Sequence, residues 1–107
     1  MATTPSAATG ARRSAASTAI EGVRALGKSA ARQWGPQGIT VNAVLVPPAL
    51  VAPELAAATT FEAQPAVGRP PDLRDDVAPT IAHFARPTSG GITGATVIVD
   101  GGSVMAP

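Results

Sequence analysis

The chain has 107 residues, of which 14% are charged, and its formal net charge is +1. A chain of this length forms one small domain at most, and its near-neutral charge does not favour binding to nucleic acid or to an anionic membrane, since such binding depends on clustered Lys and Arg. With no cysteine and a single histidine, His83, the chain offers no disulfide and no thiolate metal site, so we expect no bound metal.

The first thirteen residues are predicted to form a disordered tail. They are rich in Ala, Ser and Thr, include Arg12 and Arg13, and precede the first acidic residue, Glu21. An organelle transit peptide has a similar composition, but an alanine-rich chain produces this pattern without any targeting role. No apolar run approaches the ~20 residues of a membrane-spanning helix, so we expect a chain that does not cross a membrane and that resides in the cytoplasm.

A long amphipathic helix is predicted at about residues 14–34. Apolar residues recur there at steps of three and four, and polar residues follow the same period on another face of the helix. The apolar stripe consists of Ala16, Ala19, Ile20, Val23, Leu26, Ala30 and Trp34. Gly35 and Pro36 are expected to end the helix. We expect Trp34 to pack at that end of the helix and not to serve as a stacking platform.

Two apolar segments, at about residues 38–46 and 95–100, are predicted to be strands buried on both faces. The first is bounded by Gly and Pro, and the second ends at a tight turn. Between them, residues 47–71 are dominated by Pro and Ala and are expected to be irregular, with room for a short helix near residues 54–60.

A second amphipathic helix is predicted at about residues 72–85. Asp72 is placed to cap its start, and Asp75 and Asp76 suit its first turn, so the last two are interpreted as helix-start charges and not as an acid/base pair. Pro79 should kink the helix because it lacks a backbone donor. The order strand, helix, strand implies that the two strands are parallel.

Four segments resemble the C-terminal half of the short-chain dehydrogenase/reductase superfamily, in particular its 3-oxoacyl-ACP reductases. They are the helix SAASTAIEGVRALGKSAARQWGPQGI and the runs ITVNAVLVPPALVAP, DLRDDVAPTIAHFA and ITGATVIVDGG. The resemblance implies a partial, doubly wound Rossmann-type α/β fold, with residues 14–107 supplying the C-terminal half and its last two parallel strands. NAD or NADP is the cofactor that this family binds.

The residues that the family uses for catalysis are replaced. The resemblance implies a Tyr that protonates the substrate and a Lys four residues later, and these positions correspond to Arg13 and Ser17, in a chain that has no tyrosine at all. Arginine stays protonated and is a poor proton donor, and serine carries no charge that could lower a neighbouring pKa. Lys28 is eleven residues further along the helix, too far to replace the missing Lys.

The features that would hold the cofactor are also replaced or missing. There is no glycine-rich turn between a first strand and a helix, and the Gly90–Gly91 and Gly101–Gly102 pairs are expected to form turns. In the loop that contacts nicotinamide in the family, Pro48 stands for a glycine and Ala52 for a threonine. We therefore predict no catalytic, cofactor-binding or metal-binding residue, and no cofactor for this chain alone.

Asn42 and His83 have structural interpretations. Asn42 is expected to make a structural hydrogen bond, and His83 is expected to be a surface residue without a proton-transfer role.

Three hypotheses of function follow. The chain is a catalytically silent, truncated member of the family, such as a gene remnant or an internal-start product; or it complements another subunit that supplies the cofactor half; or it is a non-enzymatic interaction module. In each case the two strands have unpaired edges and the core is small, so we expect a homo-oligomer or a complex with another reductase subunit.

Overall fold

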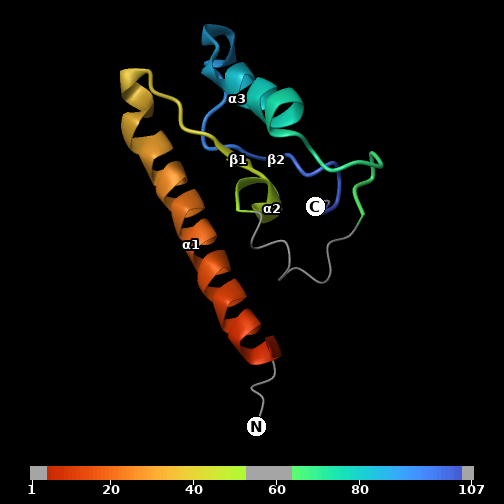
Figure 1. Cartoon of the computed structure of the whole chain (residues 1–107). Helices are drawn as coiled ribbons and strands as arrows, with labels where there is room; N and C mark the ends of the chain where they lie inside the picture. The colour runs from red at the N-terminus through yellow and green to blue at the C-terminus, as the bar shows by residue number, and fades with distance from the viewer. Residues whose placement is uncertain (1–4, 53–63, 105–107) are drawn as a thin grey trace.

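The computed structural model describes residues 5–52 and 64–104, with the backbone alone described for residues 5–14 and for residue 16. Within these ranges it contains the helices α1, α2 and α3, the strands β1 and β2, and three short turns of other helical types (Figure 1). The radius of gyration is 16.4 Å and the extents are 58 × 31 × 25 Å. A compact domain of this length has a radius of about 13 Å, so the chain is extended.

The helix α1 spans Pro5–Trp34, so it begins well before the predicted start at residue 14. The prediction of a disordered tail is therefore wrong for residues 5–13, whereas residues 1–4 lie outside the described part of the chain. Ala and Arg are strong helix formers, and Pro5 occupies the first position, where a missing backbone donor costs nothing. The predicted end is confirmed by a 3-10 turn, η1 (Gly35–Gln37), and by Gly38, which has a left-handed φ of 80°.

The strands β1 (Ala43–Leu45) and β2 (Thr96–Ile98) pair in parallel, with Val44 opposite Val97, which confirms the predicted pairing. Both strands are shorter than predicted. Before β1, hydrogen bonds of the Asn42 side chain replace the backbone hydrogen bonds between the strands. The side chain accepts a bond from the Ala95 N–H at 3.1 Å and donates one to the Ile92 carbonyl at 3.0 Å. Asn42 therefore has the structural role expected of it.

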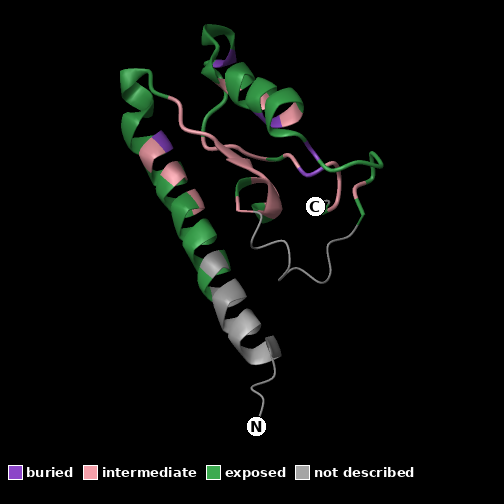
Figure 2. Cartoon of the chain, viewed as in Figure 1, coloured by how far each residue is buried: buried purple, intermediate pink, exposed green. Residues whose placement is uncertain are grey.

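The strands are not buried on both faces, and this prediction is wrong. All residues of β1 are only half-buried, and Ile98 of β2 is 39% exposed. The helix α1 lies on one side of the strands and α3 (Ala78–Ala85) on the other, but together they cover the sheet only in part (Figures 1 and 2). Among the described residues, the buried apolar side chains are Ala31 of α1, Val77 and Pro71. The two strands and two helices therefore bury few of their apolar side chains.

The stretch after β1 is more regular than predicted, since α2 (Pro48–Val51) follows the strand directly, with the Ala52 N–H donating to the Pro48 carbonyl at 2.8 Å. The predicted short helix near residues 54–60 lies outside the described residues.

The predicted helix at 72–85 consists of a π-helical turn, η3 (Leu73–Val77), followed by α3. Its predicted cap is confirmed, because the Asp72 carboxylate accepts bonds from the N–H groups of Arg74 at 2.9 Å and Asp75 at 2.7 Å. Pro79 lies in the first turn of α3, where proline is well tolerated. The irregularity expected from Pro79 therefore occurs as the wide turn before α3 and not as a kink inside it. The short turn η4 (Pro87–Ser89) follows α3.

The double hydrogen bond of Asn42 leads to a stability prediction. In Asn42→Ala, the Ile92 carbonyl and the Ala95 N–H lose their side-chain partner, so the free energy of unfolding should fall by about 1–2 kcal/mol. Urea denaturation followed by circular dichroism measures this change. Gln33→Ala, which removes an exposed amide from α1, is the control and should leave the midpoint unchanged. Equal midpoints for Asn42→Ala and the wild type would contradict this role of Asn42.

Candidate functional site

The positions of the family's catalytic pair lie on the N-terminal half of α1. Arg13 and Ser17 are four residues apart and therefore lie on one face of the helix. The side chain of Arg13 lies outside the described set, and Ser17 is exposed. The helix approaches the sheet at two places. A Cβ added to Gly27 would lie 3.9 Å from Val41 Cγ1, and a Cβ added to Gly94 would lie 3.9 Å from the Cβ of Ala31.

Ser17 is ten residues, about 15 Å of helix, from the close approach at Gly27. The N-terminal half of α1 extends away from the strands (Figure 1).

A cleft of about 300 Å³ separates α1 from the sheet. Its lining includes two cationic side chains, Arg24 and Lys28, and is otherwise mostly apolar. Arg24 is already engaged, because its Nη1 donates to Glu21 Oε1 at 2.8 Å, whereas its buried Nε lacks a hydrogen-bond partner. Lys28 is exposed and eleven residues beyond Ser17, so it does not supply the Lys of the missing pair.

The cleft is bordered by Gly27 and Gly94 and lacks a glycine-rich turn that opens a helix after a strand, which is the element that receives a pyrophosphate. Gly94 has a φ of 70°, and its N–H donates to the Val41 carbonyl at 2.7 Å. The backbone at Gly94 is therefore engaged in joining the two strand segments.

The loop after β1 and the turn after β2 meet at a second cleft, of about 250 Å³. Asp100 lines this cleft and is 9% exposed, but its carboxylate accepts bonds from the N–H groups of Gly102 and Val104, both at 2.9 Å. Gly101 and Gly102 have φ values of 70° and 81°, which confirms the predicted tight turn. A Cβ on Gly101 would come within 3.0–3.1 Å of the segment around Pro65, so this position needs glycine for space as well.

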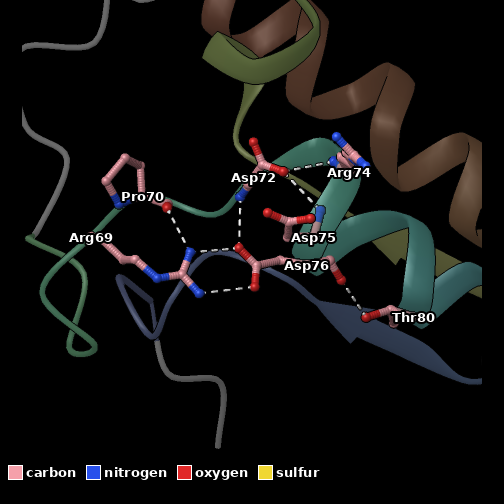
Figure 3. Close-up of polar contacts among 7 residues, drawn as sticks. All are labelled: Arg69, Pro70, Asp72, Arg74, Asp75, Asp76 and Thr80. Atoms are coloured by element: carbon pink, nitrogen blue, oxygen red, sulfur yellow. Dashed lines mark hydrogen bonds and ion pairs between the residues drawn. The ribbon is translucent and has the colours of Figure 1, made fainter.

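Among the described residues, the carboxylate of Asp76, in the turn before α3, has a pKa well below its ordinary value (Figure 3). Its carboxylate forms a bidentate ion pair with Arg69, at 2.7 and 3.0 Å, and accepts a bond from the Asp72 N–H at 2.7 Å. The hydrogen bond from Arg69, together with the backbone bond from Asp72, lowers the pKa of Asp76 to about 2. A carboxylate held ionised by two partners has no capacity for proton transfer near neutral pH, so this arrangement is a structural clamp.

His83 and Trp34 both lie at the surface of the molecule. His83 is exposed, and its ring contacts Phe84 edge to face, with centroids 5.8 Å apart. Trp34 is 41% exposed and therefore packs less fully than predicted. The part of the chain that the structure describes contains no cluster of His, Asp or Glu that could hold a metal ion. It also contains no helix with the length and hydropathy required to span a bilayer.

Comparison with known families identifies a match over residues 1–104 to a family described as Enoyl-(Acyl carrier protein) reductase. A search of curated proteins found no match. The matched range covers α1, both strands and α3, the same elements whose sequences resemble the short-chain dehydrogenase/reductases.

The ion pair of Asp76 leads to a prediction of pH dependence. Its folded pKa, about 2, is below the ordinary value of 3.8, so the stabilisation is present above pH 3.8 and is lost as the pH falls through about 2. The melting temperature of Asp76→Asn should therefore be below that of the wild type at neutral pH, and the difference should shrink across this window. Asp75→Asn removes the same charge one residue away and should retain the wild-type pH profile. A constant difference between Asp76→Asn and the wild type from pH 7 to about 2 would contradict the ionic origin.

Proposed function

Because the chain belongs to the enoyl-(acyl carrier protein) reductase family of the short-chain dehydrogenase/reductases, we propose that it is an NAD(P)-dependent oxidoreductase by ancestry that does not catalyse hydride transfer by itself. The observation that carries this proposal is the absence of tyrosine from the chain, with Arg13 and Ser17 at the positions of the family's Tyr and Lys. In this proposal the polypeptide contains only the C-terminal half of the family's fold.

Hydride transfer to a carbon–oxygen or a conjugated carbon–carbon double bond leaves negative charge on the substrate, which a positioned acid must neutralise. Arg13 is a poor donor because a guanidinium stays protonated well above neutral pH. Ser17 carries no charge that could make a neighbouring group a better acid. Asp76 is held as a carboxylate by Arg69, and the Asp100 carboxylate is occupied by two backbone N–H groups. These groups do not supply the proton.

The incomplete sheet supports the same proposal for cofactor binding. A nicotinamide dinucleotide binds across the carboxyl ends of several adjacent parallel strands, with its pyrophosphate at the N-terminus of a helix that follows a glycine-rich turn. The described residues provide a sheet of two strands, β1 and β2. In the loop that would contact nicotinamide, Pro48 begins α2 and lacks the flexibility of the family's glycine. Ala52, directly after α2, lacks the hydroxyl of the family's threonine.

The proposal predicts the result of a cofactor titration. Addition of the purified chain to NADH or NADPH should produce no saturable change in cofactor fluorescence, and no oxidation of either with an enoyl thioester or a ketone. The variant Arg13→Tyr/Ser17→Lys, which restores the catalytic pair without restoring the cofactor cradle, should also remain inactive. A saturable fluorescence change with the wild type would overturn the cofactor part of the proposal. Turnover by the double variant would show that catalysis requires only the missing pair.

A second candidate function is complementation, in which another reductase subunit supplies the cofactor half and the Tyr and Lys. In the described part of the chain, one edge of β1 has no neighbouring strand, and the faces of the sheet are partly exposed. These features favour complementation, since a further strand and its helices would cover them. A third, non-enzymatic candidate is an interaction module that binds a full-length subunit through the same surface. In each case we propose that the chain works as an oligomer, with itself or with such a subunit, and in the cytoplasm.

Complementation predicts restored turnover. Co-expression with a separate N-terminal half of a family reductase that retains its Tyr and Lys should produce NADPH oxidation that neither polypeptide shows alone. Co-purification without turnover would favour the interaction module. If the two polypeptides do not co-purify at all, both the second and the third candidates are wrong.

A further inference from the structure

Residues 65–71 run from the turn after β2 to the start of η3, and we call them the strap. Positions 65, 70 and 71 of the strap are prolines, which restrict its backbone and have no N–H to donate. Gly68 has a φ of 81°, and its N–H donates to the Pro65 carbonyl at 2.9 Å. The strap is therefore a stiff segment with few backbone donors, and its position depends on its contacts with other parts of the chain.

The first attachment of the strap is to Gly101, in the turn after β2. The Val67 N–H donates to the Gly101 carbonyl at 3.1 Å. A Cβ added to Gly101 would lie 3.0 Å from Pro65 Cβ and 3.1 Å from both the Arg69 carbonyl oxygen and Val67 Cγ2. The strap thus packs closely around this glycine. Val67 is nevertheless 66% exposed, so burial of its side chain contributes little to holding the strap in place.

The second attachment is the ion pair between Arg69 and Asp76, at the start of the α3 segment (Figure 3). The carboxylate is fixed in advance, because it also accepts a bond from the Asp72 N–H. The hydrogen bond and the charge of Asp76 raise the pKa of Arg69, and the charges of Asp72 and Asp75 raise it further. A bidentate pair with a fixed acceptor is stronger than an ordinary ion pair at a protein surface.

Arg69 belongs to both attachments. Its side chain binds Asp76, and its carbonyl oxygen packs against Gly101. One residue therefore connects the start of α3 with the turn after β2. At the Gly101 end, the hydrogen bond from Val67 joins two neutral groups, whereas the bonds to Asp76 join two charged groups and are about twice as strong. The ion pair is consequently the stronger of the two attachments.

Solvent ions reach this ion pair, because the side chains of Arg69 and Asp76 are 60% and 23% exposed. The hydrogen bonds that join the strands involve residues 41–45 and 92–99 and none of the strap. We propose that the Arg69–Asp76 pair is a salt-sensitive latch. When the pair is closed, it holds the strap against Gly101. When the pair is broken, the strap leaves the turn after β2 and the pairing of the strands persists.

Hydrogen exchange of the full chain, resolved by NMR, tests the latch. The Val67 amide reports the strap, and the Gly94 amide, which donates to the Val41 carbonyl, reports the sheet. In Asp76→Asn, the Val67 amide should exchange roughly tenfold faster and the Gly94 amide at its wild-type rate. Asp75→Asn removes the same charge one residue away and should leave both rates unchanged. An unchanged Val67 rate in Asp76→Asn, or equal acceleration of both amides, would overturn the proposal.

Salt provides a test on the unmodified protein. Raising the salt concentration from about 0.01 M to about 1 M should accelerate exchange of the Val67 amide relative to the Gly94 amide by roughly twofold to fivefold. Asp76→Asn lacks the ion pair and should not show this relative acceleration. The same salt response in the wild type and in Asp76→Asn would show that the strap is not held by charge.

A double-mutant cycle tests whether the two attachments act together. Gly101→Ala places a Cβ against the strap and should accelerate exchange of the Val67 amide. Gly38→Ala is the matched control, because Gly38 also has a positive φ, of 80°, and a Cβ there would meet no atom within 4 Å. In the Gly101→Ala background, Asp76→Asn should have little further effect on the Val67 rate. Fully additive effects would overturn the proposal. These readouts are independent of cofactor titration, so the latch and the lack of activity stand or fall separately.

Discussion

The parallel pairing of β1 with β2 is the contact on which the rest of the structure depends, because segments about fifty residues apart meet there and hold the two helices to the sheet. Each strand has three residues, so hydrogen bonds beyond the ends of the strands are needed to stabilise the pairing. Before β1, the Asn42 side chain forms hydrogen bonds with Ile92 and Ala95, and the Val41 N–H donates to Thr93 Oγ1 at 3.0 Å. At the other end, the proline pair after Val46 prevents further pairing.

A two-stranded parallel sheet does not bury itself, and this constraint explains the exposure of the apolar side chains. Parallel strands normally lie inside a larger sheet with helices on both faces. Here α1 and α3 lie on two sides of the strands, yet Val23 and Leu26 of α1 remain 69% and 70% exposed. These apolar residues follow the pattern of a buried core, but no described part of the chain covers many of them.

Three carboxylates in the described part of the chain stabilise its turns. Asp72 caps the turn before α3, Asp76 joins that turn to Arg69, and Asp100 closes the turn after β2. Each of these carboxylates accepts hydrogen bonds from partners within the chain, so all three stabilise turns of the fold. Ser17, by contrast, lies on a segment of α1 that extends beyond the sheet.

Local signals in the sequence determined the family, the end of α1 near Gly35, the Asp72 cap and the parallel strands, because caps, breakers and apolar periods act over a few residues. The absence of tyrosine likewise required no structure. Only the tertiary structure decided that α1 starts at Pro5, that the strands are short and half-exposed, and that Pro79 is accommodated by a wide turn before α3. Burial is a property of what surrounds a residue. An apolar run in the sequence predicts a buried segment. Whether the segment is buried depends on which other parts of the chain pack against it in three dimensions.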